Sequence, residues 1–376
     1  MIGTSTIDAQ NLQAYFSYCT FNSPDKGPYL ETYVTVIGKS AVYKRNANGK
    51  FQAAIQISLT LKQDTVVKYF DRYNLLSPEN DDSVNITFDF LDQQRITVPN
   101  GRYLLGISIA DNNNNSNTFS LEQPIKINYQ NDSISISDIE LLTSYNKAEQ
   151  VTPLTKSGFD LIPYTSNFFP IHLTHIKFYT EIYNTDKVIT DQPFLVRYSV
   201  KSYETKQVVA SLSNFSKQTA KGVNVIMGTF PIDKLPSGNY HLTIEVVDKT
   251  NKLLRQRRLF FQRSNQLSPL DKLISITLSR GFALKFDKAH IQEYVKCLSP
   301  ISSETELIFA QNALGSNDST IMQKYFQAFW EKRNSDEPES QWRKYFKNVK
   351  IAEKLYGTRI LKGYETDRGM VYLNMV

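Results

Sequence analysis

A repeat at a constant offset of 137 residues most constrains how this chain can fold. Residues 98–111 align without gaps on residues 235–248, with matching Pro, Gly, Tyr, Leu, Ile and Asp positions. Each copy reads as a Pro/Gly turn leading into a strand with apolar residues at alternate positions. The offset is too long for a solenoid or propeller blade and suits a sandwich of short antiparallel strands. Tyr103 and Tyr240 should therefore face the same way in two separate sheets.

Further strand patterns lie upstream of each copy, at residues 30–37 and 51–61 in the first unit and at residues 176–183 and 194–200 in the second. Composition also favours strands, because 22 tyrosines and 22 phenylalanines stand against 5 methionines and 2 tryptophans. We predict a mainly β fold with two tandem antiparallel β-sandwich (Ig-like) domains, at residues 10–131 and 132–265. The boundary between them falls in the polar stretch 128–132, which has no apolar pattern.

After residue 265 the apolar period changes to that of helices. Capping residues and apolar spacing predict a C-terminal helical module of about four helices at residues 266–357. In chain order, Asp287 caps the first helix, Ser302 or Ser303 caps the second, Ser319 precedes the third, and Pro338 lies in the first turn of the fourth, which ends near Tyr356. In the last segment, 358–376, residues 359–361 and 369–373 resemble the starts of strands around a Gly-rich turn.

No residue pattern nominates a catalytic, cofactor-binding or metal site. Gly-Lys-Ser at residues 38–40 resembles the end of a phosphate-binding loop, but the required upstream glycine is replaced by Tyr33. His172 and His175 form no metal constellation with the other histidines, and the run 111–115 lacks the carboxylate ladder of a calcium loop. We therefore expect no cofactor and no metal, and we lean against an enzyme.

Charge and hydropathy restrict the partners. The net charge of +6 is small for a nucleic-acid binder of several domains, so we expect no nucleic-acid partner. No apolar run reaches the roughly 18 residues of a membrane span, and residues 1–9 lack the basic and apolar regions of a signal peptide. Peripheral membrane association stays open. The last predicted helix has a basic stripe, which is either a solvated face or a surface for phosphates or an acidic partner: Arg343, Lys347, Lys350 and Lys354.

The densest motif lies at residues 363–372, where two glycines frame an adjacent Asp and Arg ahead of an alternating apolar pattern. Asp and Thr side chains can satisfy turn amides, and Arg can form bidentate pairs. The motif is thus either a structural turn at a helix-to-strand junction or an interaction surface built from Tyr364, Asp367 and Arg368. The candidate residues are Gly363, Tyr364, Thr366, Asp367, Arg368 and Gly369.

This motif resembles the signature of the GWxTD domain-containing proteins, an envelope-associated family found largely in Bacteroidota. Tyr364 stands where the family name has Trp. The chain ends at Val376, shortly after the signature, so we expect the GWxTD-type domain at residues 358–376 to be incomplete (truncated). Other stretches similar to the family are residues 14–18, 134–144, 260–265 and 329–334.

The resemblance implies export, with a periplasmic or outer-membrane-associated location, and it brings no established activity with it. Our leading hypothesis is a non-enzymatic interaction or scaffold protein of the bacterial cell envelope, whose partner is another envelope protein. One alternative is a carbohydrate-binding protein, which exposed aromatic residues along a sandwich face would favour. The other is an enzyme with a site at the junction of the helical module and the GWxTD segment, which clustered carboxylates with perturbed pKa values would favour.

Overall fold

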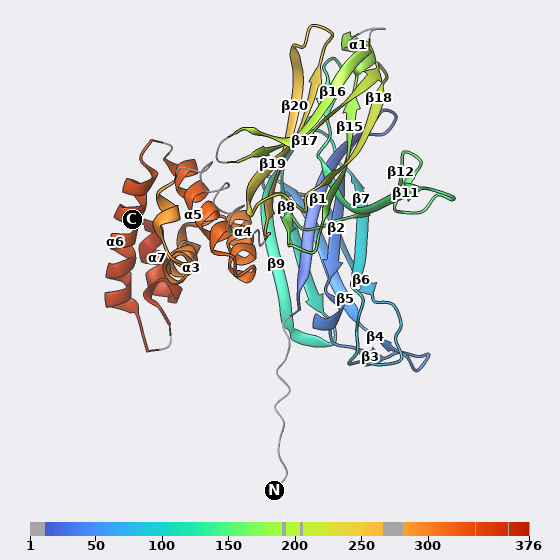
Figure 1. The fold of residues 1–376 in the computed structure, drawn as a ribbon. Coiled ribbons are helices and arrows are strands. Elements are labelled where there is room, and N and C mark those ends of the chain that lie inside the picture. The colour runs from blue at the N-terminus through green and yellow to red at the C-terminus, as the bar shows by residue number, and fades with distance from the viewer. Residues whose placement is uncertain are drawn as a thin grey trace. The chain divides into compact units, whose positions relative to one another are not determined.

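The computed structural model describes residues 12–189, 193–203, 206–265, 281–334, 336–359 and 361–375. Strands dominate the chain up to Arg263, interrupted by the short helix α1 (Thr185–Ile189), and helices follow from Phe282 onward (Figure 1). The predicted mainly β fold with C-terminal helices is therefore confirmed, while the Ig-like topology stays a prediction. Residues 1–9, which the sequence places outside the signal-peptide pattern, lie outside the described residues.

Contacts divide the chain into two compact units that interleave along the sequence. The first unit comprises residues 1–166, 178–192 and 219–227, and the second comprises residues 167–177, 193–218 and 228–376. Strands β15 (His175–Tyr183) and β18 (Val223–Pro231) each pass from one unit into the other. The domain boundaries expected from the sequence stay a prediction, and each unit is described by itself.

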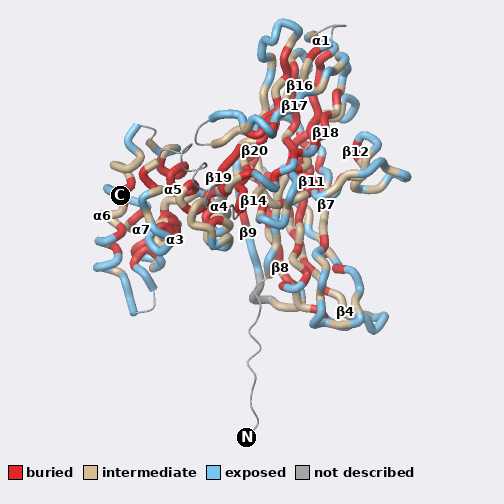
Figure 2. Tube along the Cα trace, in the orientation of Figure 1, coloured by how far each residue is buried: buried red, intermediate tan, exposed pale blue. Residues whose placement is uncertain are grey.

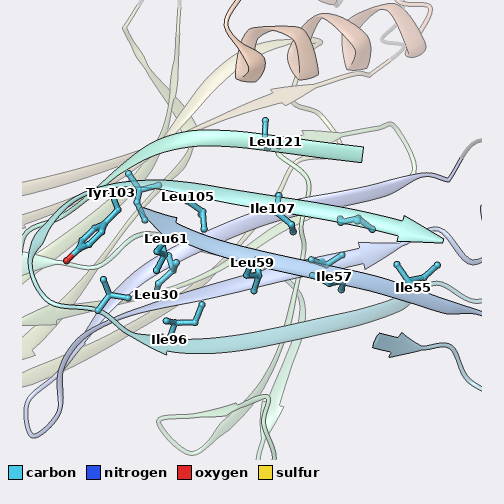
Figure 3. Close-up of a cluster of buried hydrophobic side chains, with 14 of the residues drawn as sticks. Leu30, Ile55, Ile57, Leu59, Leu61, Ile96, Tyr103, Leu105, Ile107 and Leu121 are labelled. Carbon is cyan, nitrogen blue, oxygen red and sulfur yellow. The ribbon is translucent and has the colours of Figure 1, made fainter. Parts of the chain in front are cut away.

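Two antiparallel sheets of the first unit share one hydrophobic core. The first sheet has the order β1 (Ala14–Ser23), β2 (Gly27–Val36), β7 (Phe90–Thr97), and the second has the order β6 (Val66–Leu76), β5 (Ala54–Gln63), β8 (Gly101–Asp111), β9 (Asn114–Ile127). Every second residue of β5 is buried from Ile55 to Leu61, as the alternation of a strand with one buried face requires. Figure 3 shows these side chains gathered with Leu30 and Ile96 of the other sheet.

The first copy of the repeat forms the turn into β8. The hydroxyl of Tyr103 donates to the carbonyl of Pro99 at 3.0 Å, and the ring is buried. A Cβ on Gly101 would lie 2.9 Å from two atoms of that ring, so only glycine leaves it room. Asn100 holds the chain beyond β9, because its side chain donates to the carbonyl of Tyr129 at 2.7 Å and accepts from the Tyr129 amide at 2.8 Å.

The first unit also holds most of a third sheet and a small hairpin. The third sheet has the order β10 (Ser135–Ile136), β15, β11 (Glu140–Lys147), β13 (Phe159–Pro163), β12 (Thr155–Lys156), and β18 pairs with β15. The hairpin joins β3 (Lys44–Arg45) to β4 (Phe51–Gln52), and the 3-10 turn η1 (Gly38–Ser40) precedes it. The Gly-Lys-Ser stretch of the sequence is thus a short turn between strands.

The β part of the second unit is a five-stranded sheet. Its order is β14 (Phe168–Phe169), β20 (Leu253–Arg263), β19 (Gly238–Val247), β16 (Pro193–Ser202), β17 (Val208–Thr219). Tyr240, Leu242, Ile244 and Val246 are all buried along one face of β19, as the alternating pattern predicts, and the buried residues of β16, β19 and β20 are red in Figure 2.

The second copy of the repeat forms the turn into β19 with the same bonds as the first. The hydroxyl of Tyr240 donates to the carbonyl of Pro236 at 2.9 Å, and its ring is buried. The hydroxyl of Ser237 donates to the carbonyl of Asn265 at 2.9 Å and accepts from the Asn265 amide at 2.8 Å, beyond the next strand. The prediction that Tyr103 and Tyr240 are equivalent residues in separate sheets is confirmed.

Three of the four predicted helices begin where the sequence places their start residues, and the third begins at Ser319 itself, capped by Asp318. The helices of this region are η2 (Phe282–Lys285), α3 (Lys288–Lys296), η3 (Ser299–Ile301), α4 (Glu304–Gly315), α5 (Ser319–Arg333), α6 (Pro338–Tyr356), η4 (Gly363–Glu365) and α7 (Asp367–Met375). The side chain of Asp287 accepts from the amide of His290 at 2.9 Å. Ser303 and Glu306 form a capping box at the start of α4.

One part of the secondary-structure prediction is wrong. Residues 369–373, expected as the start of a strand, lie within helix α7. The alternation of Met370, Tyr372 and their neighbours looked like a strand, but a helix cap at Thr366 decides the local structure. Residues 359–361 form no strand where the structure describes them, and Ile360 lies outside the described residues.

Candidate functional site

Thr366 controls how the signature turn enters its helix. Its hydroxyl accepts a hydrogen bond from the amide of Gly369 at 3.1 Å and donates one to the carbonyl of Gly363 at 2.9 Å. Thr366 therefore caps α7 and ties it to the turn η4. Asp367 follows in the first turn of α7, where the helix dipole favours a carboxylate.

The two glycines of the signature permit unusually close backbone packing. A Cβ on Gly363 would lie 2.4 Å from the carbonyl oxygen of Ala352 and 2.4 Å from the amide nitrogen of Glu353, both in α6. A Cβ on Gly369 would lie 1.7 Å from the carbonyl oxygen of Gly363. Because all these neighbours are backbone atoms, no side-chain adjustment can make room. The turn is therefore packed tightly between α6 and α7.

Tyr364 belongs to the core of the helical region. Its side chain is only 3% exposed, and its hydroxyl donates to Oε1 of Glu293 in α3 at 3.1 Å. Burial, together with the Glu293 carboxylate, raises the pKa of the Tyr364 phenol. The aromatic position of the signature thus anchors the turn to α3. The same core is rich in aromatic rings, and Trp342 at its centre lies 4.7 Å from Phe346 and 4.8 Å from Phe326 between ring centroids.

Asp367 and Arg368 are the exposed polar members of the signature. Neither has a hydrogen-bond or ion-pair partner within the part of the chain that the structure describes. Tyr364 lies in the core, so the surface suggested by the sequence is reduced to these two residues. Their role as an interaction surface stays a prediction.

An ion pair between the buried Glu306 and the exposed Arg333, which the sequence analysis missed, lies at the margin of the helical core. Glu306 accepts from Arg333 through both carboxylate oxygens, at 3.2 and 2.9 Å, and from the amide of Ser303 at 3.0 Å. Burial opposes ionisation of Glu306, but Arg333, Ser303 and Lys332 outweigh it and lower its pKa to about 2. Arg333 also lies 3.4 Å from the ring centroid of Phe329. The Ser-x-x-Glu spacing of a capping box was the available signal.

Within the second unit, the helices rest on the repeat turn that begins β19. The ammonium of Lys324 in α5 is buried and donates to the carbonyl of Ser237 at 2.7 Å. The Ser237 hydroxyl shares its one proton between the carbonyl of Asn265 and the carboxylate of Asp318, the residue that caps α5. The rings of Phe260 in β20 and Phe309 in α4 lie 4.7 Å apart. The second Pro/Gly turn therefore seats the helical region on the sheet.

The first unit contains a separate buried charge cluster centred on Lys156. Its ammonium lies 2.6 Å from Oε2 of Glu31 and 2.6 Å from Oε2 of Glu140. Nε of Arg95 lies 2.6 Å from the other oxygen of Glu31, and the hydroxyl of Tyr33 donates to Glu31 at 2.5 Å. The two carboxylates and two cations balance each other, which is the condition for burying such groups.

The two carboxylates of this cluster differ in their proton affinity. Burial opposes ionisation of both. Lys156 and Arg95 together overcome it at Glu31 and lower its pKa, whereas Glu140 is repelled by Glu31 and its pKa is raised. The ammonium lies 3.7 Å from the ring centroid of Phe21, so the cluster is enclosed by aromatic side chains. It joins β2 to β11 and β12 inside the first unit.

The outer face of the five-stranded sheet gathers polar and aromatic side chains. Glu245 accepts from Lys201 at 2.7 Å and from Gln256 at 2.7 Å. The ring of His241 lies 5.2 Å from that of Tyr203 between centroids. Desolvation and two nearby cations, Lys206 and Arg258, lower the pKa of His241 to about 4, so the imidazole is neutral at pH 7.

The described residues contain no group of three or more His, Cys, Asp or Glu side chains that could hold a metal ion. Cys19 and Cys297 are free and buried. None of the helices in the described ranges is both long enough and apolar enough to cross a membrane.

The match to known families falls on the helical region and the signature. Residues 285–375 match the family model of the GWxTD domain, so the resemblance seen in the sequence is confirmed. This region of the chain therefore contains a GWxTD domain. The match spans η2 to α7, so the helices and the signature turn fall within one matched region, and the boundary predicted at residue 357 lies inside it.

No curated protein matches the chain. Among solved structures, it is similar to a red sea bream transglutaminase, with 7% identity over 67% of this chain and 31% of that chain and a TM-score of 0.21. It is also similar to the fibronectin(III)-like modules of Clostridium thermocellum CbhA, with 9% identity over 63% of this chain and 86% of that chain and a TM-score of 0.18. The chain spans about a third of the transglutaminase. Likeness this distant carries no argument about function.

Proposed function

We propose that this chain is a non-enzymatic interaction or scaffold protein of the bacterial cell envelope, with another envelope protein as its partner. The observation that carries the proposal is the edge strand β6. Among the described residues it pairs only with β5, and it exposes Val66 to 54% and Phe70 to 56%. Exposed apolar side chains on a free sheet edge are typical of a surface that takes a strand from a partner.

The charges on β6 indicate the chemistry of that partner. Phe70 and Arg72 share the outward face, and the guanidinium of Arg72 lies 5.6 Å from the ring centroid of Phe70. Lys68, at the bulge of the strand, is exposed as well. Like charges directly opposite each other disfavour pairing. A partner strand that alternates apolar and acidic residues fits this face best.

The test compares two matched double variants in affinity purification from the native envelope in mild detergent. Val66→Lys with Phe70→Lys changes the β6 face, while Val208→Lys with Phe215→Lys changes two exposed residues of β17, the edge of the other unit's sheet. We expect wild type and the β17 variant to retain a stoichiometric protein partner and the β6 variant to lose it. Exposed substitutions of this kind should change the free energy of unfolding by only about 0.5 kcal/mol.

Two results would contradict the proposal. Purification of the wild-type protein alone would argue against a scaffold, and equal recovery of the partner with all three proteins would remove β6 as the contact. The envelope location rests on the family resemblance and needs its own test. Cell fractionation with antibody detection should find the protein in the periplasmic or outer-membrane fraction, and a purely cytoplasmic signal would refute that part.

The signature can be tested for an interaction role separately from its structural one. Thr366→Ala removes the cap of α7 and should lower the free energy of unfolding by about 1 kcal/mol. The double change of Asp367→Ala and Arg368→Ala alters exposed side chains and should cost less. If the exposed pair contacts the partner, this second variant loses binding while its stability is retained. Full binding by it would mean that the signature serves the fold alone.

One observation favours carbohydrate binding as a second candidate function. On the face of the five-stranded sheet that carries His241, the rings of Tyr203 and His241 lie next to Lys201, which pairs with Glu245. Aromatic faces next to such groups suit sugar rings. A glycan array with the wild-type protein and the Tyr203→Ala variant tests it. Binding that disappears in the variant would support this candidate, and no binding by wild type would exclude it.

A further inference from the structure

The face of α6 that points away from the helical core is strongly basic. Arg343, Lys347, Lys350 and Lys354 recur at helical spacing and are all exposed, so the basic stripe predicted from the sequence is confirmed. Lys344 lies on the neighbouring row and is exposed as well. Trp342, Tyr345, Val349 and Ala352 are the buried residues of the same helix.

Most of these cations are not neutralised by the protein. Glu339 at the margin of the face pairs with Arg343 at 2.7 Å and with Lys285 at 3.4 Å. Where the chain is described, no carboxylate lies in ion-pair range of Lys344, Lys347, Lys350 or Lys354. An open hollow of about 500 Å³ lies among Glu339, Ser340, Arg343, Lys344 and Lys347. The first half of α6 thus offers an electropositive hollow in which an anionic group fits.

The second half of the same face exposes apolar side chains. Ile351 is 41% exposed and Leu355 is 60% exposed. Their spacing of four residues places them on one row, next to the row of Lys347 and Lys354. Exposed aliphatic side chains such as Ile351 and Leu355 are unfavourable on a face that contacts only water. Basic side chains flanking exposed aliphatic ones are the pattern of a helix that lies on an anionic bilayer.

We propose that this face of α6 binds the surface of an anionic phospholipid bilayer. The lysines and Arg343 contact the lipid phosphates, the hollow receives a head group, and Ile351 and Leu355 enter the boundary between head groups and acyl chains. A single-stranded nucleic acid would need exposed rings for stacking. Phe346 in α6 is instead partly buried and covered by Lys350 at 4.9 Å. The proposal is independent of the protein partner at β6.

Vesicle co-sedimentation with the full chain tests the proposal. Wild type should bind vesicles of phosphatidylglycerol and phosphatidylcholine and should not bind pure phosphatidylcholine, with affinity that falls as salt rises. Exchange of Lys344, Lys347, Lys350 and Lys354 for Gln should weaken binding at least tenfold, since each lysine near an anionic surface contributes on the order of 1 kcal/mol. Circular dichroism melting checks that the variant remains folded.

A matched control separates this face from the net charge of the protein. Exchange of four exposed lysines elsewhere, Lys26, Lys126, Lys147 and Lys234, for Gln removes the same charge and should change binding less than twofold. An equal loss in both variants would overturn the proposal, because net charge alone would then explain binding. No vesicle binding by wild type would overturn it too.

Two further arms test the apolar row and the identity of the anion. Ile351→Ser with Leu355→Ser should lower the affinity for anionic vesicles at least threefold, with the salt dependence preserved; unchanged affinity would refute insertion. Inorganic phosphate at fixed ionic strength should not displace the vesicles. A single-stranded oligonucleotide or an acidic peptide that binds more tightly than the vesicles would identify a different partner and overturn the proposal.

Discussion

The two Pro-x-Gly-x-Tyr turns make the same internal bonds in different surroundings. In each, the tyrosine hydroxyl donates to the carbonyl of the proline four residues earlier. The three atoms nearest to a Cβ on Gly101 all belong to Tyr103, whereas a Cβ on Gly238 would first meet Lys324 of α5 at 3.0 Å. At the first turn, the space next to the glycine is filled by its own tyrosine. At the second turn, a lysine of α5, in the GWxTD domain, packs against the glycine.

This difference indicates how a duplicated element takes on a second task. The bonds that define the turn are present in both copies. The contact with the helices uses the carbonyl of Ser237, which Lys324 reaches, and the hydroxyl of Ser237, which bonds to Asn265 within the turn and also meets Asp318. Divergence between the copies therefore marks the site of attachment.

The largest expected effect comes from Lys324→Met, which removes the ammonium and leaves the carbonyl of Ser237 buried without that donor. Loss of a hydrogen bond from a charged donor should lower the free energy of unfolding by about 2–3 kcal/mol. Urea denaturation measures it, and hydrogen exchange should show faster opening near Ser237 but unchanged exchange near Asn100. Lys126→Met, at an exposed lysine of β9, is the control. If the two variants lose the same stability, the contact between Lys324 and the second turn does not stabilise the protein.

The next largest effect is expected when the glycine of each turn is replaced by alanine, and its size should differ between the two copies. Gly101→Ala places a methyl group 2.9 Å from the buried Tyr103 ring and should cost about 2 kcal/mol. Gly238→Ala meets the end of Lys324 and should cost about 1 kcal/mol. A double-mutant cycle of Gly238→Ala with Lys324→Met should show coupling, because the closest contact of the added methyl group, with Nζ at 3.0 Å, disappears with the lysine. Additive effects would contradict that arrangement.

Removal of each tyrosine hydroxyl tests the equivalence of the copies. Tyr103→Phe and Tyr240→Phe each lose one hydrogen bond to a proline carbonyl and should each lower the free energy of unfolding by about 1 kcal/mol. Chemical denaturation of both variants, with Tyr15→Phe at an exposed tyrosine as control, gives the comparison. A large effect in one copy only would show that the tyrosine–proline hydrogen bond contributes differently to stability in the two copies.

The smallest effect depends on pH. His241 stands where the first copy has Leu104, and its pKa in the folded protein is about 4 because of desolvation and nearby cations. The unfolded chain, with an ordinary histidine pKa near 6.5, binds the proton first, so stability falls as pH drops from about 6.5 towards 4. The loss should stay near 1 kcal/mol, because the ring is partly exposed. Guanidinium unfolding at pH 7 and 4.5 measures this loss of stability. The His241→Leu variant should show a smaller difference in the free energy of unfolding between the two pH values. If the variant shows the same difference as wild type, another group is responsible for the pH dependence.

The sequence predicted those elements whose signals are local. Asp287, Ser303 and Pro338 are helix-start residues that act within a few positions, and the helices begin at them. The repeat predicted the equivalence of Tyr103 and Tyr240 because its determinants lie within one turn. Helix α7 was missed because its apolar residues alternate like those of a strand, while the close approach of Gly363 to α6 has no local signal.

The candidate site was predictable only in part for the same reason. The signature residues were recognised, but burial of Tyr364 depends on Glu293, which is 71 positions away. The Lys156 cluster had no sequence signal at all, since Glu31 lies 125 positions before its lysine. Isolated carboxylates and lysines occur throughout the chain, and only the tertiary fold selects which of them are enclosed together.

That cluster also bears on the order in which the chain can complete its fold during synthesis. Glu31 leaves the ribosome first, and Arg95, the first of its two cationic partners, follows 64 positions later. Lys156 comes a further 61 positions on, the difference between 125 and 64. Until Lys156 is synthesised, full burial of β2 would leave the Glu31 carboxylate with the half-exposed Arg95 as its one cationic partner in the cluster. We therefore expect the first two sheets to become fully enclosed only after the hairpin that carries Lys156 has been synthesised.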